Sequence, residues 1–112
     1  MTAYHAGELE VQRRMGQAEI AVRVGRMIRT EIPAAGAAFL AEQPMVVLAA
    51  TDDAGRVWAS LVTGPAGFMH ADADGTIAVG ALPVPGDPLH EVLRRPDEQV
   101  GMIAIEPQTR RR

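Results

Sequence analysis

The sequence contains no cysteine and no lysine, and Ser60 is its only serine. Without cysteine, the chain can form neither a disulfide framework nor a thiolate metal site. Without lysine, Schiff-base chemistry is excluded, and a serine nucleophile could only be Ser60. All 11 basic residues are arginines in a chain rich in alanine and glycine, so we attribute the missing lysine to codon usage rather than to function.

Long apolar runs and a basic excess are also lacking. Residues 1–9 contain no continuous apolar segment of the kind that opens a secretory signal. The longest weakly polar stretch, residues 34–51, is interrupted by Glu42, Gln43 and Pro44, so we expect no membrane span and a cytoplasmic protein. A net charge of −3 argues against nucleic-acid binding, which needs a basic face.

The length of 112 residues, with 47% apolar and 22% charged residues, is typical of one small globular domain. Apolar residues at helical spacing predict helices over residues 8–15, 17–30 and 34–42. Pro33 separates the last two, because proline disfavours helix before it and favours the start of a helix after it. We therefore assign residues 1–43 to an N-terminal helical segment that packs on the rest of the domain.

The pattern changes to strands after Pro44. Residues 45–50 form a continuous apolar run, typical of a strand buried on both faces. Residues 56–63 alternate after a glycine-containing turn, which predicts a hairpin. Two further strands are predicted over residues 76–82 and 99–106, with a short helix between them over residues 89–94.

These elements predict a mainly β, α+β fold in which residues 44–112 form an antiparallel barrel or sandwich with helices at one side. Four strands do not close a barrel. The last strand would leave an open edge unless more chain or a second subunit covers it.

Motifs for metal binding and hydrolysis are absent from the sequence. His5, His70 and His90 lie far apart and form no ligand spacing. The segment 72–75 is typical of a plain turn rather than of a calcium loop. Ser60 lies within a predicted strand, not at a nucleophile elbow, and no glycine-rich segment has the spacing of a phosphate or dinucleotide loop.

The segment 55–68 contains the residues best suited to a ligand. Trp58 offers stacking area, Ser60 and Thr63 offer hydroxyl groups, and Gly64 leaves backbone amides accessible. This mixture suits a planar heteroaromatic ligand that carries a phosphate, while ordinary core and turn is the alternative explanation.

Five segments spread over the chain point to one family. They are YHAGE at 4–8, IPAAGAAFLAEQPM at 32–45, GRVWASLVTGPAGF at 55–68, PGDPL at 85–89 and VGMIAIEPQTRRR at 100–112. Together they resemble the pyridoxamine 5′-phosphate oxidase-related, FMN-binding split-barrel proteins, and the Trp-Ala-Ser-Leu stretch is the most specific part of the resemblance.

The resemblance implies a homodimer of split β-barrels with FMN in clefts at the dimer interface. It also implies an oxidoreductase that moves a hydride through the flavin, acting with a small-molecule substrate or electron donor. The cofactor-binding residues that it implies are Trp58, Ala59, Ser60, Leu61, Thr63, Gly64, Leu82, Arg110 and Arg112. Family members continue into further barrel strands after Arg112, so we expect a barrel truncated after its fourth strand.

The loop before the short helix departs from the family pattern. Pyridoxamine phosphate oxidases carry a phosphate clamp there, whereas this chain has Asp87, which would repel a phosphate and is expected to cap the helix with Pro88 at its first position. Oxidation of vitamin B6 is therefore not expected. Either arginines elsewhere in the chain bind the phosphate of FMN, or the protein binds another flavin or a deazaflavin, or it binds no cofactor.

No residue is identified as catalytic, although His5 and His70 are the nearest candidates for an acid or base. The alternative to an enzyme is a non-catalytic flavin- or ligand-binding module, or a dimerisation module that has lost its cofactor.

Overall fold

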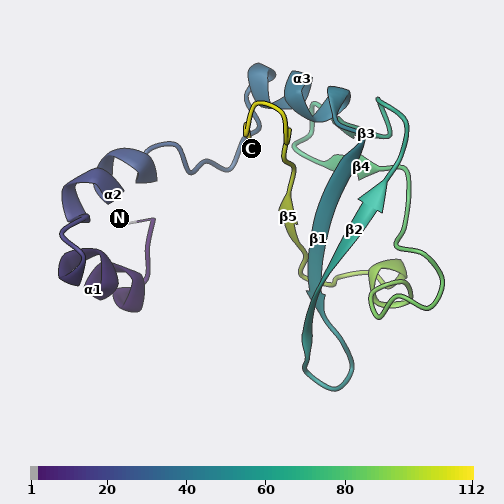
Figure 1. Ribbon diagram of the computed structural model, residues 1–112, viewed down its shortest axis with the longest axis horizontal. Coiled ribbons are helices and arrows are strands. Elements are labelled where there is room, and N and C mark those ends of the chain that lie inside the picture. Colours follow the sequence, from purple (N-terminus) through teal and green to yellow (C-terminus); the bar gives the residue numbers. More distant parts are fainter. Residues whose placement is uncertain (1–2) are drawn as a thin grey trace. The chain divides into compact units, whose positions relative to one another are not determined.

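A computed structural model describes residues 3–112 and has an α+β fold, in which three α-helices accompany two antiparallel sheets (Figure 1). The chain divides into two compact units, residues 1–32 and residues 33–112, and each is described by itself. The third helix belongs to the second unit. The boundary between the units therefore lies at Pro33, whereas the sequence pattern predicts a change after residue 43.

The first unit contains helices α1 (Ala6–Arg14) and α2 (Ala18–Gly25). His5 caps α1, because its Nδ1 accepts hydrogen bonds from the backbone N–H groups of Gly7 and Glu8 at 3.1 and 3.3 Å. The Glu8 carboxylate in turn accepts a hydrogen bond from the His5 backbone N–H at 2.8 Å. This reciprocal pair is a capping box, which satisfies N–H groups that a helix start leaves open.

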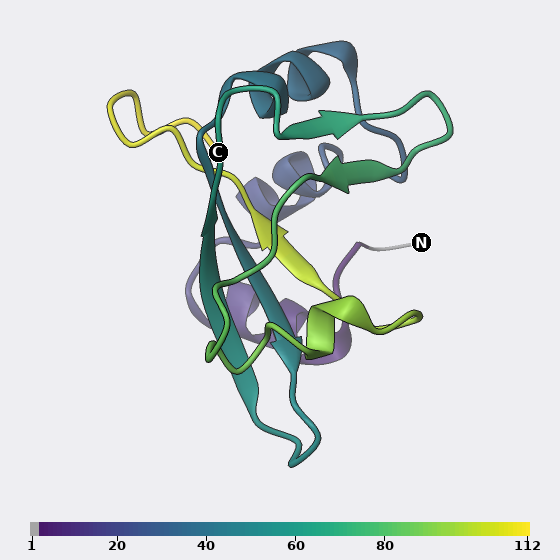
Figure 2. The same ribbon diagram turned by 90° about the vertical axis from the view of Figure 1, so that its right-hand side faces the viewer.

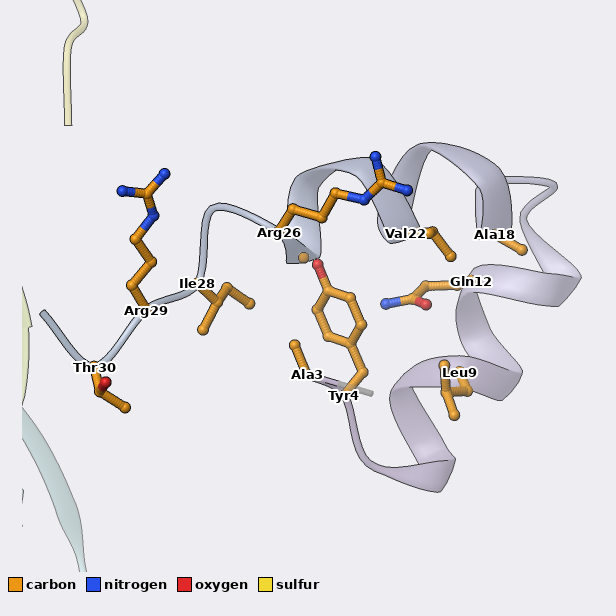
Figure 3. Close-up of a pocket in the computed structure, with 11 residues that line it drawn as sticks. Ala3, Tyr4, Leu9, Gln12, Ala18, Val22, Arg26, Ile28, Arg29 and Thr30 are labelled. Carbon is orange, nitrogen blue, oxygen red and sulfur yellow. The ribbon is translucent and has the colours of Figure 1, made fainter. Parts of the chain in front are cut away.

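The first unit has no buried core. The predicted helix over residues 17–30 is too long, because α2 ends at Gly25, where the Tyr4 ring lies against the backbone. A hollow of about 760 Å³ lies beside this ring. Figure 3 shows Gln12 and Val22 among the side chains around it. No residue from 3 to 32 is buried. Its exposed large apolar side chains are Leu9, Val11, Met15, Ile20, Val22, Val24, Met27 and Ile28.

The second unit is built on a three-stranded antiparallel sheet in the order β2–β1–β5. Its strands are β1 (Met45–Thr51), β2 (Val57–Thr63) and β5 (Gly101–Ile103). The register between β1 and β2 is unbroken over all seven residues of each strand, and β5 pairs with the middle of β1. The predicted hairpin is therefore confirmed.

Smaller elements cover one end of this sheet. Strands β3 (Met69–Ala71) and β4 (Ile77–Val79) form a separate antiparallel pair, and α3 (Ala34–Glu42) lies against β3. Figure 2 shows α3 and this pair at the end of the unit that is remote from the β1–β2 turn. The 3₁₀-helix η1 (Val92–Arg94) packs against β1.

The core lies on one face of β1 and β2, beneath α3 and β3. Its main cluster consists of Leu40, Val46, Leu48, Val62, Phe68 and Met69, and a second cluster consists of Ala50, Leu89 and Val92. Gly64 allows the chain to turn back over this core, because a Cβ built there would lie 2.5 Å from Cγ of Phe68.

Several strand predictions need correction. Residues 3–112 contain five strands rather than the four expected, because residues 69–71, for which no strand is predicted, form the short β3. The predicted strands 76–82 and 99–106 shrink to β4 and β5, and the predicted helix 89–94 is a turn followed by η1. Pairing partners limit these elements: β4 pairs only with the three residues of β3, and β5 only with three residues of β1.

Burial of β1 also differs from the prediction. Its apolar run predicts burial on both faces, but only alternate residues are buried, whereas Met45, Val47 and Ala49 are half-buried and Thr51 is exposed. Within residues 3–112 the two sheets stay separate and do not close into a barrel. Residues 110–112 do not form a strand, since a turn leads to a single bridge between Glu106 and Arg111.

Candidate functional site

The predicted ligand-binding residues of β2 lie on opposite faces of the sheet. Side chains alternate along a strand, and Ser60 is buried with Val62 on the face that packs on the core. Ala59, Leu61 and Thr63 are exposed on the other face, called the outer face below. A flat ligand on one face of the sheet can therefore contact only one of these two sets of side chains.

Ser60 anchors the loop between β4 and η1 to the inner face of β2. Its hydroxyl donates a hydrogen bond to Oδ1 of Asp87 at 2.7 Å, and the same oxygen accepts a hydrogen bond from the Leu89 backbone N–H at 2.8 Å. Asp87 therefore closes the turn before η1 and does not cap a helix as expected, because η1 begins only at Val92 with Glu91 as its N-cap. Ser60 is only 5% exposed, so its hydroxyl serves the hydrogen bond to Asp87 on the inner face and does not face the outer surface of the sheet.

Trp58 is fixed at the turn end of β2. Its indole Nε1 donates to Oδ2 of Asp52 at 2.9 Å, and the Arg56 Nε donates to the same oxygen at 2.8 Å. The Arg56 guanidinium lies 5.8 Å from the centroid of the indole ring, within the range of a cation–π contact. Trp58 is 38% exposed, so it keeps some open surface although its orientation is set by the hairpin.

Asp52 organises this hairpin turn. Its Oδ1 accepts hydrogen bonds from the backbone N–H groups of Ala54 and Arg56, both at 2.9 Å. The Trp58 indole N–H, followed by the Arg56 backbone N–H, holds the pKa of the Asp52 carboxyl well below its ordinary value. The carboxylate therefore stays charged through the physiological range.

The outer face carries a row of small residues across all three strands. Ala49 of β1 lies opposite Ala59 of β2 and opposite Gly101 of β5. A Cβ built on Gly101 would lie 3.6 Å from the Cβ of Ala49, which confirms that these positions share one face. We call this row, Ala59–Ala49–Gly101, the shelf.

Larger apolar side chains border the shelf. On one side Val47 pairs with Leu61 and with Ile103, and on the other Thr51 pairs with Val57. A hollow of about 570 Å³ lies against the shelf on the second side. It is lined by Ala49, Ala50, Thr51, Val57, Gln99, Val100 and Gly101. The outer face thus offers a row of small residues with larger side chains on both sides and a hollow toward the β1–β2 turn.

Strand β2 leaves one backbone edge open, since β1 is its one neighbour among residues 3–112. Two backbone hydrogen bonds lie at the two ends of the hairpin. One runs from the Asp52 N–H to the Arg56 carbonyl at 2.8 Å, and the other from the Gly64 N–H to the Pro44 carbonyl at 3.0 Å. Hydrogen-bonded pairs alternate along an antiparallel ladder, so the even-numbered residues of β2 bond to β1. The backbone groups that face the open edge belong to Val57, Ala59, Leu61 and Thr63.

The end of β2 and the C-terminal turn lie at the same end of the sheet (Figure 1). Both β2 and β5 are antiparallel to β1, so both run toward the end at which β1 begins. There Pro44 accepts the hydrogen bond from Gly64 and also lines a hollow of about 460 Å³ with Glu106 and Arg111. Gly64 and the arginine-rich turn, predicted as parts of one site, are thereby brought to one end of the sheet.

The three C-terminal arginines differ in their contacts. Arg111 forms an ion pair with Glu106, and its guanidinium lies 5.4 Å from the centroid of the Phe39 ring. Within residues 3–112, Arg110 and Arg112 have neither a hydrogen bond nor an ion pair, and both are exposed. They are therefore available to an anion at this end of the sheet.

Leu82 is the remaining residue predicted to bind the cofactor, and it lies in the loop that follows β4. Asp87 of the same loop accepts the hydrogen bond from Ser60 of β2. Ala49 and Gly101 were not predicted from the sequence. Their place on the shelf depends on the pairing of β1 with β5, for which the sequence carries no local signal beyond small residues at alternate strand positions.

The histidines have local roles rather than a shared site. His5 caps α1, and Nδ1 of His90 lies 2.6 Å from the Pro83 carbonyl oxygen. Nε2 of His70 lies 3.7 Å from a carboxylate oxygen of Asp72. Among residues 3–112, no group of three or more acidic or histidine side chains is placed to hold a metal ion. In the same range, no helix has the length and apolar character that crossing a membrane requires.

The chain matches no profile of a known protein family, and no curated protein or solved structure matches it significantly. A functional assignment therefore depends on the geometry of the outer face and its surroundings.

Proposed function

We propose that this chain is an FMN-binding protein of the split-barrel type that acts as an oxidoreductase, with FMN held non-covalently at the interface of a homodimer. The outer face of the β2–β1–β5 sheet carries the proposal. It combines a shelf of small residues, an open backbone edge and two unpaired arginines at one end. Few ligand classes need these three features together.

The shelf suits the isoalloxazine ring of a flavin, which is large, flat and mostly apolar. Ala59, Ala49 and Gly101 present at most a methyl group above the backbone, so a planar ring can approach the sheet closely. Leu61 borders the shelf on one side and Val57 on the other. Ligand sites are commonly of this kind, largely apolar with a few polar groups that fix orientation.

The open edge of β2 suits the polar end of the same ring. The pyrimidine part of a flavin presents alternating hydrogen-bond donors and acceptors, and the outward backbone groups of Ala59, Leu61 and Thr63 alternate in the same manner. In this arrangement Trp58 and Ser60 act from the inner face. They hold the hairpin and the loop between β4 and η1 in place and do not contact the ring.

A phosphate group suits the arginine-rich turn. Arg110 and Arg112 are exposed and unpaired at the end of the sheet where β2 ends, and arginine binds phosphate in bidentate geometry. Asp87, by contrast, lies with its carboxylate engaged by Ser60 and Leu89. The phosphate is therefore assigned to the turn and not to the loop that holds it in pyridoxamine phosphate oxidases.

A second copy of the chain would cover what a bound ring leaves open. Leu61 and Ile103, which border the shelf, are 57% and 43% exposed, and β2 has an unpaired edge. Exposed apolar surface next to an open strand edge is typical of an interaction surface. Dimerisation over the outer face would shield the flavin from water and complete the barrel-like enclosure.

When bound, FMN supplies a redox centre that can accept or donate a hydride. The chain's own residues bind the ring, orient it and exclude water from it. Strands β1, β2 and β5, which form the shelf and its borders, contain no acidic or basic side chain. The proposed chemistry therefore needs only orientation of a donor against the exposed face of the cofactor.

Titration of the purified protein with FMN tests the proposal. We expect stoichiometric uptake, read from the change in visible flavin absorption, and reduction of the bound flavin by a nicotinamide donor. Uptake without reduction by nicotinamide or by other hydride donors would favour the non-catalytic binding module. A protein that takes up no FMN would contradict the flavin assignment itself.

A further inference from the structure

We propose that Arg111 is a positioning residue that presents Arg110 and Arg112 to the phosphate of the bound flavin, and so makes the site select FMN over riboflavin. The inference rests on the proposed flavin site. It adds a mechanism by which the site would bind FMN, the phosphorylated flavin, more tightly than riboflavin.

Three contacts hold Arg111 in place within the second unit. Its guanidinium pairs with the Glu106 carboxylate and lies over the Phe39 ring of α3 at 5.4 Å from the centroid. Its backbone carbonyl accepts a hydrogen bond from the Glu106 N–H at 2.8 Å, which closes the turn over residues 106–111. Lysine could not reproduce this combination, because only a planar guanidinium stacks on a ring while it donates to a carboxylate.

The surface to which Arg111 attaches is itself fixed. Gln43, only 3% exposed, donates a hydrogen bond from Nε2 to the Phe39 carbonyl oxygen at 3.0 Å and so holds the C-terminal end of α3. The Arg111 guanidinium is the main cause of the lowered pKa of the Glu106 carboxyl, with smaller contributions from Thr109 and Gln43. The Arg111 side chain, which is 59% exposed, thus lies between the Phe39 ring and the Glu106 carboxylate.

The backbone of the turn shows that its conformation is imposed. Arg110 has a φ of 59°, in the left-handed region that residues other than glycine, asparagine and aspartate seldom occupy. The closed Glu106–Arg111 bridge holds the residue there. Strained backbone is often found where a side chain must be presented in a set direction.

The two neighbours of Arg111 are the free cations of this turn. Arg110 and Arg112 are exposed and, in the described part of the chain, have no acidic partner, whereas Arg111 has one. FMN and riboflavin share the same ring and differ in the terminal phosphate. Two guanidinium groups at the end of the sheet where β2 ends would thus act on one flavin and not on the other.

The experiment compares the affinities of FMN and riboflavin for the full chain and its variants, by quenching of flavin fluorescence. We expect the wild type to bind FMN at least about 10-fold more tightly than riboflavin, which corresponds to one charge-assisted phosphate contact or more. The double variant Arg110→Ala/Arg112→Ala should remove this preference. Arg111→Ala should lower FMN affinity about 5- to 10-fold and leave riboflavin affinity unchanged.

Two further variants separate positioning from folding. Glu106→Gln removes the ion pair but keeps the ring contact, and should reduce the FMN preference by a smaller factor. Arg94→Ala, which removes an exposed arginine of η1, is the matched control and should leave both affinities unchanged. Circular dichroism verifies that each variant is folded.

Three outcomes would overturn the inference. Equal affinities of the wild type for FMN and riboflavin would contradict it while the proposed flavin site stands. A parallel loss of both affinities in folded Arg111→Ala and Glu106→Gln would give Arg111 a general structural role instead. A wild type that binds neither flavin would contradict the proposed function and this inference together.

Discussion

Asp52 is the side chain on which the β1–β2 turn depends most. It accepts hydrogen bonds from Trp58 and Arg56 side chains and from two backbone N–H groups. The same contacts hold the pKa of its carboxyl well below the ordinary value of about 3.9. A depressed pKa in the folded state means that the charged carboxylate stabilises the fold above the unfolded pKa, and that this stabilisation is lost as the pH falls.

Asp52→Asn should therefore destabilise the protein at neutral pH and much less in acid. The difference in unfolding free energy between wild type and variant should be constant above about pH 5 and shrink below about pH 4, where the unfolded wild-type carboxyl takes up a proton. Urea unfolding followed by the fluorescence of Trp58, the one tryptophan of the chain, measures it. A difference that is the same at pH 7 and at about pH 3 would show that the charge plays no part.

Ser60 contributes to stability through its hydrogen bond to Asp87. Ser60→Ala removes a buried donor to a carboxylate, so we expect the free energy of unfolding to fall by about 1–2 kcal/mol. The loop over residues 83–90 should also exchange its amide protons faster. Thr63→Ala, on the exposed outer face of the same strand, is the control and should change stability by less than about 0.5 kcal/mol. Equal losses in the two variants would contradict the anchoring role of Ser60.

Among the strands, the link from β2 to β3 is the most tightly constrained. A Cβ at Gly64 would lie 2.5 Å from the Phe68 ring, whereas a Cβ at Gly101 would lie 3.6 Å from its nearest neighbour. Gly64→Ala should therefore cost about 1–3 kcal/mol of stability through overpacking. Gly101→Ala should fold with nearly unchanged stability. Thermal or urea unfolding of the two variants compares them directly, and a larger loss at Gly101 would contradict the packing described for these turns and strands.

The sequence predicts those elements whose cause is local. The β1–β2 hairpin was predictable because alternation, the Asp52–Gly55 turn and two long strands occur within one segment. Strands β3 and β5 were missed or misjudged in length because each is three residues long and is defined by its partner. The partial exposure of the outer face of β1 could not be predicted either, because an apolar run does not show whether a second layer covers that face.

The candidate site was predictable in part. The resemblance pointed to β2 and to the C-terminal arginines, and the antiparallel pairing brings the end of β2 and those arginines to one end of the sheet. The alternation of β2 was visible in the sequence, but which of its faces is open depends on the core. Ala49 and Gly101 join the shelf only through pairing between distant segments. The anchoring of Arg111 by Phe39 likewise depends on tertiary packing.

For the chain as a whole, the two units differ in how much apolar surface they bury. Residues 33–112 contain the buried clusters around Met69 and Leu89, whereas no residue from 3 to 32 is buried. A fragment of residues 33–112 should thus unfold cooperatively on its own. A peptide of residues 1–32 should show little helical structure in water, since short helices without packing are marginal. Circular dichroism of the two fragments tests both expectations, and a stably helical peptide would contradict them.

The central claim is that the shelf on the outer face of the sheet holds a flavin ring. The most direct measurement is FMN binding to Gly101→Val compared with wild type, since the added Cβ would meet Ala49 at an ordinary contact distance of 3.6 Å and the branched side chain would occupy the shelf. Ala73→Val, in the exposed β3–β4 turn, is the control. The account predicts that wild type and Ala73→Val bind FMN equally and that folded Gly101→Val loses at least about 10-fold in affinity. Undiminished FMN binding by Gly101→Val would contradict it.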